Sequence, residues 1–553
     1  MTDLNQFRTK VTTIRYSRYL GVPTLVAMGS NISVGVGIYL FIGSILQAIG
    51  YQTPMAYVLT LFFFIPIILT LAERMPLIHA GGGIYDLTRA RENVRRGFIN
   101  GWMLLGGLLG LGALLALGAV QYFNYLLVQL FDSSLPVPLL IIFLVLLIAI
   151  NQYLGTHAEW HKRRLLVGGG ILFLLFLLVL AVVKPQPGMI AYAWLPTTDE
   201  IEAVPFLAIG LWGIYFILER SDQLRSARQD GLSTLLAPMV ILAGLGIVTA
   251  LVLLRYPTLI LNSTAPLVLL AQAYHPLLAL LLVLFVTAMM ITGLNQVFTS
   301  VFLLAHEMRK DGLLPPALMR VRGRQDVPER LLLILTILII LTAVLTTINS
   351  AATIASACLL TALVAIHSQD IGTKASRLPA ERKLKLPLHP LFPIIVVILC
   401  VTLIILQPFE DLLWPLLWLL VGVILYLLYA RQATIAKLQE AVVIKEDQPE
   451  RTKAAYQIMV CLSRQETAVS LIQAGAAIAK AEQGDLLVLR VLDVPEQTPN
   501  KQETARTLLA ELETLIQQAE VGDLVVSPLV RIAPSVSTGI LSTAWEESVS
   551  AIL

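Results

Sequence analysis

Two clusters of glycine and small polar residues interrupt long apolar segments of this chain. The first cluster, Gly29 to Gly37, lies within residues 20–50, and the second, Gly210 to Tyr215, lies within residues 203–222. A helix in lipid must satisfy its backbone groups internally, so such clusters are tolerated at mid-depth only where the backbone faces protein or a watery cavity. Paired interruptions in corresponding halves of a chain are typical of the binding site of a transporter.

A broken helix offers two kinds of binding group. The free N–H groups that begin a half-helix carry roughly +0.5 charge from the helix dipole and suit an anion, whereas free carbonyls suit a cation. We therefore predict that amides between Ser33 and Gly37 bind the carboxylate of a zwitterion and that carbonyls between Gly210 and Ile214 bind its ammonium group. The glycines would permit close backbone approach, and tight helix packing through small residues is the alternative. The predicted substrate-binding residues are Ser30, Asn31, Ser33, Gly35, Val36, Gly37, Gly210, Trp212, Gly213, Ile214 and Tyr215.

Polar side chains inside apolar segments are costly in a membrane and are therefore candidates for function. Glu219 follows the second cluster by about one and a half helical turns. It is either a protonatable gate or an acid paired with Arg220 or Arg225 near the inner surface. Three further candidates for ion coupling, for which interhelical hydrogen bonding is the alternative role, are Thr292, Asn295 and Thr299.

The composition predicts an all-α polytopic membrane protein. Of the 553 residues, 57% are hydrophobic and only 14% are charged. A helix needs about 20 apolar residues to cross the hydrocarbon core, and twelve stretches qualify. They lie near residues 20–50, 55–74, 97–130, 136–154, 165–183, 203–222, 234–254, 276–306, 331–348, 350–367, 390–408 and 411–430.

The basic residues concentrate in alternate loops. These clusters run from Arg8 to Arg18, Arg89 to Arg96, Lys162 to Arg164, Arg220 to Arg228, Arg309 to Arg330 and Lys374 to Lys385. The positive-inside rule then places both termini in the cytoplasm and requires an even number of spans. The polar, basic start runs directly into a span too long for a signal peptide. We predict an integral protein of a prokaryotic inner membrane.

The last part of the chain changes character. A polar linker over residues 432–453 follows the membrane domain of residues 1–431, and residues 454–553 alternate between strand and helix patterns. Strands are predicted at 455–462, 485–491, near 523–532 and at 550–553, with helices at 467–483, 501–519 and 537–547. This alternation indicates a cytoplasmic, doubly wound α/β domain, apparently truncated at its last strand. Cys358, Cys400 and Cys461 have no disulfide or metal spacing.

Four motifs follow one another along residues 20–430. They are Gly35-Val36-Gly37-Ile38-Tyr39; Pro76 with Ala80-Gly81-Gly82-Gly83-Ile84-Tyr85, Gly97 and Gly101-Trp102; Asp222-Gln223; and Lys310-Asp311-Gly312-Leu313-Leu314-Pro315 with Pro328. In this order and spacing they resemble motifs of the amino acid, polyamine and organocation permease superfamily. The resemblance implies two inverted five-helix repeats, about 20–184 and 203–367, in which helices one and six are broken. Two extra helices, about 390–430, would complete twelve.

The chain departs from that family at informative positions. Val36 replaces the serine of the helix-one motif, and Asp222 is followed by Gln223 where the family usually has paired acids. Gly170 stands where a proton-coupled branch has a lysine. Sodium-coupled relatives use two adjacent hydroxyls where this chain has Thr292 and Gly293. The resemblance therefore leaves the coupling ion open between a proton and sodium.

The C-terminal segment resembles the universal stress protein fold. Residues 458–463 match the first strand of that family, but Ser463 stands where its nucleotide-binding members carry an aspartate. The glycine-rich phosphate loop would follow residue 553 and is missing. Nucleotide binding is therefore possible but unsupported, no cofactor is predicted, and a regulatory or homodimerising role is the better hypothesis.

Taken together, these features predict a secondary transporter of an amino acid or related organic cation. The expected partners are a small-molecule substrate, a coupling ion and the lipid bilayer, and no nucleic acid. Two alternatives stay open: an inorganic ion carrier of the cation-chloride type, although Trp212 replaces its threonine, and a nutrient receptor that signals through the tail. An enzyme is disfavoured because no nucleophile, base or metal cluster occurs at helical spacing.

Overall fold

The computed structural model describes residues 21–553 with internal gaps, the longest at 186–203, 320–327, 372–389, 431–442, 446–455 and 494–500. The chain forms two compact units that divide between Leu428 and Tyr429. Several features used above lie outside the described residues. These are the basic N-terminal segment, Ala80 and Gly81, the basic loops 320–324 and 374–385, most of the linker, and Ser463.

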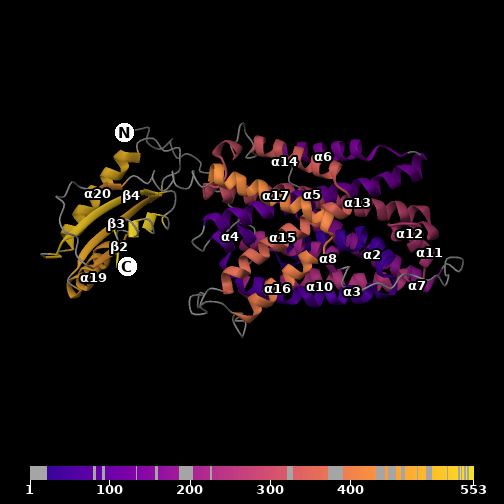
Figure 1. The fold of residues 1–553 in the computed structure, drawn as a ribbon, viewed down its shortest axis with the longest axis horizontal. Coiled ribbons are helices and arrows are strands. Elements are labelled where there is room, and N and C mark those ends of the chain that lie inside the picture. Colours follow the sequence, from indigo (N-terminus) through magenta and orange to yellow (C-terminus); the bar gives the residue numbers. More distant parts are fainter. Residues whose placement is uncertain are drawn as a thin grey trace. The chain divides into compact units, whose positions relative to one another are not determined.

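The first unit is helical (Figure 1). It begins with α1 (Val22–Val34), the π-helix η1 (Gly35–Leu40) and α2 (Ile42–Ile49). Pro23 lies in the first turn of α1, where its missing N–H costs nothing. Gly50 ends α2 with a φ of 52°, a left-handed conformation that favours glycine.

Most of the remaining elements of this unit coincide with predicted apolar segments, whereas the short helices Gly83–Arg89, Pro257–Asn262 and Pro266–Tyr274 lie between those segments. In chain order they are α3 (Thr53–Arg74), α4 (Gly83–Arg89), α5 (Val94–Phe131), α6 (Val137–Tyr153), α7 (Trp160–Val183), α8 (Val204–Leu207), η6 (Ala208–Gly210), α9 (Leu211–Glu219), η7 (Ser221–Gln223), α10 (Ala227–Leu253), α11 (Pro257–Asn262), α12 (Pro266–Tyr274), α13 (Pro276–Lys310), α14 (Glu329–Leu345), α15 (Ile348–Ile371), α16 (Leu391–Ile405), α17 (Phe409–Leu425) and η10 (Tyr426–Ala430).

Eight helices among the described residues are long and apolar enough to cross a membrane. Shorter apolar helices, such as Val137–Tyr153 and Leu391–Ile405, lie between them in the chain. The count of twelve spans therefore stays a prediction. Large apolar side chains such as Phe143, at 66% exposure, and Ile405, at 72%, point outward. Lipid is the environment in which such a surface is stable, so this is an integral membrane protein.

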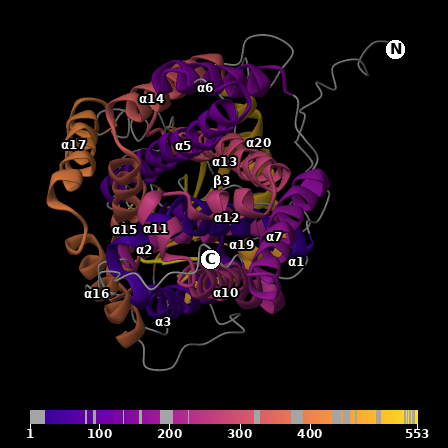
Figure 2. The same cartoon turned by 90° about the vertical axis from the view of Figure 1, so that its right-hand side faces the viewer.

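Helix α5 is the centre of the helical unit. In its most apolar stretch 89% of the residues are buried, and it packs against α13, α14, α15 and α17. In α17 the corresponding share is only 11%. Figure 2 shows α16 and α17 at the rim of the unit.

The second unit contains a five-stranded sheet. Its elements are β1 (Val443–Lys445), β2 (Gln457–Cys461), α19 (Ala468–Ala481), β3 (Asp485–Asp493), α20 (Lys501–Gln518), β4 (Val526–Ala533) and β5 (Ala551–Ile552). The strand order is β1-β4-β3-β2-β5, and all neighbouring pairs are parallel except β1 with β4. The four predicted strands are present. The domain assignment as a universal stress protein fold stays a prediction.

Strand β1 corrects the linker prediction, because it comes from the segment assigned to the linker. Val443 pairs with Arg531 and Lys445 pairs with Leu529 in an antiparallel register. The edge of β4 presents unpaired backbone groups, and the β-branched pair Val443-Ile444 suits a strand there. The composition of the linker does not reveal this pairing, because the partner strand lies more than eighty residues further along the chain.

Side chains from both faces of the sheet are buried. Ile458 and Val460 pack with α19 on one face, and Met459 packs with Leu487 on the other. Burial on both faces is typical of a parallel sheet. At the end of β2, burial raises the pKa of the Cys461 thiol to about 11, so this cysteine stays protonated and unreactive near neutral pH.

Candidate functional site

Helices α1 and α9 cross at two glycines, with backbone against backbone. A methyl group added at Gly213 would lie 2.4 Å from Ser33 Oγ and 2.5 Å from the Gly29 carbonyl oxygen. At Gly29 it would lie 3.0 Å from the Gly213 carbonyl oxygen and 2.7 Å from Ile217. The Ser33 hydroxyl reaches across the crossing, with the Gly210 carbonyl at 2.9 Å and the Gly29 carbonyl at 3.1 Å as acceptors. The structure thus brings together, at this crossing, Gly29, Ser33, Gly210 and Gly213.

The first interruption takes a different form from the predicted one. The helix widens into the π-helix η1 without unwinding, and the Gly35 N–H still donates to the carbonyls of Asn31 and Ile32. Free amides between residues 33 and 37, the predicted carboxylate site, are therefore not available in this conformation. A π-helix accommodates the glycines while keeping backbone hydrogen bonds, and such segments are frequent at functional sites.

Tyrosine hydroxyls donate hydrogen bonds to carbonyls of the π-helix. Tyr57 from α3 donates to the Gly37 carbonyl at 2.7 Å, and Tyr122 from α5 donates to the Tyr39 carbonyl. The Tyr39 hydroxyl in turn donates to the Gly170 carbonyl of α7 at 3.0 Å. Three neighbouring helices therefore hold this segment, and no sequence signal identified these partners.

The second interruption is shorter and earlier than predicted. It is the 3-10 turn η6 at Ala208–Gly210, whereas Gly213, Ile214 and Tyr215 lie within the regular helix α9. Trp212 is fully buried, and its indole N–H donates to the Ala355 carbonyl at 3.1 Å. The carbonyls after Gly210 that were predicted to bind an ammonium group therefore belong to the regular helix α9.

Two predicted polar residues have buried atoms without hydrogen-bond partners among the described residues. These atoms are Ser30 Oγ and Asn31 Oδ1. The Asn31 amide nitrogen donates to the Met289 carbonyl of α13 at 3.2 Å. Gln296 Nε2 on α13 is also buried without a partner. Buried polar groups are normally paired, so these atoms are candidates for contact with a ligand.

Gln296 lies on the face of α13 that α1 covers. Met289, Gly293 and Gln296 recur at helical spacing, and a methyl group at Gly293 would meet Ile32 at 2.8 Å and the Asn31 amide nitrogen at 3.5 Å. From the sequence, Gln296 could line the cavity or bond between helices, and interhelical hydrogen bonding is the favoured role. Val36 and Gly37 also belong to the first cluster. Val36 is fully buried, and Gly37 faces Leu242.

Glu219 is buried at the end of α9, with 2% exposure. Its Oε2 accepts a hydrogen bond from Ser300 of α13 at 2.5 Å, whereas Oε1 has no hydrogen-bond partner among the described residues. Helix α4 covers it: a methyl group at Gly83, whose φ is +53°, would lie 3.2 Å from the Glu219 Cα. Sequence reasoning missed Ser300, because 81 residues separate it from Glu219.

The side chains of the other ion-coupling candidates form hydrogen bonds with groups other than Glu219. The Thr292 hydroxyl donates to the Ala288 carbonyl, and the Thr299 hydroxyl donates to the Asn295 carbonyl, both on α13 itself. Asn295 Oδ1 accepts from Gln152 of α6 at 2.7 Å. Asn295 and Thr299 therefore contact Gln152 of α6, as expected for interhelical hydrogen bonding, whereas the Thr292 hydroxyl bonds only within α13.

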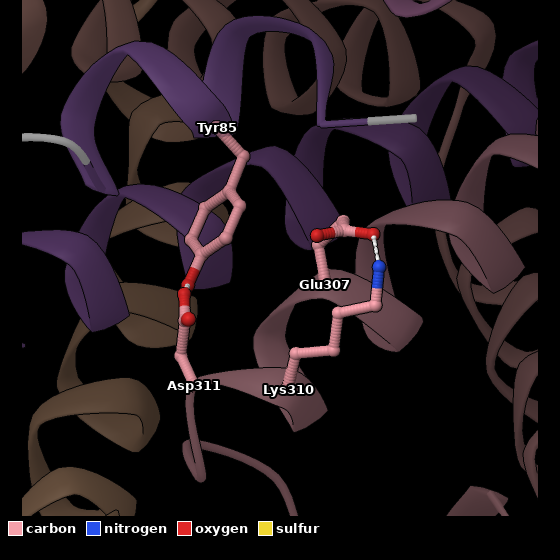
Figure 3. A network of polar contacts seen from close by, with 4 residues as sticks. All are labelled: Tyr85, Glu307, Lys310 and Asp311. Carbon is pink, nitrogen blue, oxygen red and sulfur yellow. Dashed lines mark hydrogen bonds and ion pairs between the residues drawn. The ribbon is translucent and has the colours of Figure 1, made fainter. Parts of the chain in front are cut away.

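A polar network at the end of α13 holds α4 in place (Figure 3). The Tyr85 hydroxyl donates to Asp311 Oδ2 at 2.6 Å, and Lys310 pairs with Glu307 at 2.6 Å. One turn further along α4, Asn100 of α5 donates to the Thr88 hydroxyl at 3.0 Å. The glycine-rich motif of the sequence therefore continues into a short helix that is tied to α5 and α13 and closes over Glu219.

One family model matches most of the helical unit. Residues 20–429 match the amino acid permease family. A manganese transporter from Eremococcus coleocola is 15% identical, over 75% of this chain and 94% of that one, with a TM-score of 0.45. A nucleobase-cation-symport-1 family transporter, solved closed with bromovinylhydantoin bound, is 13% identical over 76% and 97% of the chains, with a TM-score of 0.48. Curated proteins give no match.

Proposed function

This chain belongs to the amino acid permease family, and from that membership we propose that it moves an amino acid or a related organic cation by alternating access. A permease changes the position of its substrate and not its chemistry. The proposal includes twelve spans arranged as two inverted repeats, with both termini in the cytoplasm of a prokaryotic cell. It is supported by the interrupted helices at η1 and η6.

The observation that carries the substrate class is the set of unpartnered atoms on α1 and α13. Asn31 Oδ1 is an acceptor that suits an ammonium group, and Gln296 Nε2 is a donor that suits a carboxylate. Ser30 Oγ can serve either end. We propose that a zwitterion satisfies these atoms when helix motions open the crossing, with the side-chain groups taking the place of the backbone amides expected from sequence.

A thermal-shift measurement on the purified protein tests this proposal. A ligand that binds the folded state at 100 times its Kd stabilises it by about 2.7 kcal/mol. We expect stabilisation by one or more amino acids and not by the matching amino amide or by the deaminated acid. Stabilisation by inorganic salts alone would favour an ion carrier, and binding without uptake into vesicles would favour a receptor.

We further propose that the coupling ion is a proton carried by Glu219. The oxygen atoms offered by Thr292, Thr299 and Asn295 already take part in protein hydrogen bonds, whereas Glu219 Oε1 has no partner among the described residues. Sodium would need several oxygen ligands at one place. A carboxylate that is enclosed by α4 and opens with it can bind and release a proton on opposite sides of the membrane.

The sheet unit is proposed to regulate transport, without a claim of nucleotide binding. The family match ends at residue 429, and the helical and sheet units divide at 428. Deleting residues from 431 onward, a cut that removes β1 together with its sheet, should leave substrate affinity within about twofold while changing the maximal uptake rate. Aggregation of the shortened chain would show that the sheet unit is needed for folding of the protein. An unchanged uptake rate would refute a regulatory role.

A further inference from the structure

Two tryptophans join α5 to α17 by a reciprocal contact. Trp102 Nε1 donates to the Trp418 carbonyl at 2.8 Å, and Trp418 Nε1 donates to the Trp102 carbonyl at 2.8 Å. The two rings are stacked, with centroids 4.5 Å apart and planes 8° apart. Each indole N–H is satisfied by the partner's backbone, so the pair needs no water and suits a site within lipid.

Each tryptophan fits into a notch made by a glycine. A methyl group at Gly106 would lie 2.3 Å from Trp418 Nε1, and one at Gly422 would lie 2.2 Å from Trp102 Cδ1. Each glycine follows the tryptophan of its own helix by four residues, which places both on one helix face. We call these four residues the tryptophan clamp.

The next residue of α5 forms a notch for Trp212. A methyl group at Gly107 would lie 2.5 Å from Trp212 Cζ2 and 3.2 Å from the Cys358 Cβ. Trp212 lies in the second sequence cluster, on the α9 side of the crossing. One stretch of α5 therefore contributes Gly106 to the clamp and contacts the site helix through Gly107.

The clamp is a principal attachment of α17. Only 11% of the most apolar stretch of this helix is buried, and α17 lies at the rim of the helical unit (Figure 2). Its other polar link to the interior among the described residues is the hydrogen bond from Ser350 to Asp411 at 2.5 Å. Movement of α17 would therefore be transmitted to α5 largely through the clamp.

We propose that Trp102 and Trp418 are positioning residues of the substrate site: by clamping α5 to α17, they fix the Gly107 notch in which Trp212 rests. Neither residue touches the site. This inference rests on the proposed function, since Trp212 matters to transport only if the crossing of α1 and α9 binds substrate.

The test compares Trp418→Phe with Trp414→Phe, a control on the same helix whose side chain is 38% exposed. Stacked indoles give an exciton couplet in circular dichroism, which Trp418→Phe should abolish and Trp414→Phe should keep. The apparent Kd for a substrate amino acid should rise about fivefold to tenfold in Trp418→Phe, because a smaller fraction of the protein is competent to bind. The double variant with Trp102→Phe should be no worse than either single variant, because the pair acts as a unit.

Alkylation of Cys358 gives a readout that needs no substrate. This thiol is fully buried on α15 beside Gly107. A membrane-permeant maleimide, with the modified cysteine identified by mass spectrometry, should label it at least about fivefold faster in Trp418→Phe than in Trp414→Phe. Trp418 also packs against the buried cluster that contains Cys358. Trp102→Phe leaves that cover in place and should therefore give the same faster labelling if the clamp positions α5.

Several results would overturn the inference. A lost couplet with unchanged Kd and unchanged Cys358 labelling would make the clamp a local packing feature. Equal effects from Trp414→Phe would show that α17 acts without the clamp. If the wild-type protein binds no amino acid, the proposed function fails, while Cys358 labelling in Trp102→Phe still decides whether the clamp positions α5.

Discussion

Replacing Gly213 by alanine should reduce amino acid uptake about tenfold or more, although the substitution adds a single methyl group. That methyl would lie 2.4 Å from Ser33 Oγ and 2.5 Å from the backbone of Gly29, where no flexible side chain can yield at both contacts. Overpacking of this kind typically costs about 1–3 kcal/mol. Alanine in a helix interior is otherwise favoured over glycine by roughly 0.5–1 kcal/mol, so a loss can arise only from the crossing.

The matched control is Gly35→Ala, at a glycine of the other interruption, η1. A methyl group there would meet Met290 at 3.8 Å, an ordinary contact with a flexible side chain. We expect uptake and thermal stability close to wild type. Uptake in vesicles and unfolding of the detergent-purified protein measure both variants. Equal tolerance of the two substitutions would show that the helices do not need to approach at Gly213, and equal loss would assign Gly35 an additional role.

Glu219→Gln should abolish the response of uptake to a pH gradient, lowering gradient-driven accumulation about tenfold or more. The carboxyl group is 2% exposed, and Ser300 donates to only one of its oxygens. An ionised acid in such a place is costly, so it is a natural group to carry a proton through the membrane. Glutamine keeps the size of the side chain and can still accept from Ser300. We therefore expect exchange of substrate across the membrane to survive.

Glu307→Gln is the control for this variant. Glu307 lies in α13 near the same end of the unit, where it pairs with Lys310. Uptake should keep its pH dependence in that variant, as measured with a labelled substrate over a series of external pH values. An unchanged pH profile in Glu219→Gln would assign Glu219 to structural pairing at the end of α9, and loss of exchange as well would make it part of substrate binding.

The sequence alone determined where the helices lie and which segments are interrupted. Apolar stretches of about 20 residues and clusters such as Gly35 and Gly37 are local features, and membrane burial acts on each of them directly. The strands at 457–461 and 485–493 were likewise predictable from alternation with helical patterns. The candidate site residues on α1 and α9 were proposed from this local information.

Only the tertiary structure decided which side chains meet. The rotation of each helix about its axis is set by packing with its neighbours, and apolar composition all around a membrane helix conceals that rotation. The bond from Ser300 to Glu219, the tyrosine hydroxyls on the π-helix and the pairing of Trp102 with Trp418 all join residues on different helices. Strand β1 shows the same limit in the sheet, because a three-residue strand is specified by the free edge it covers and not by its own composition.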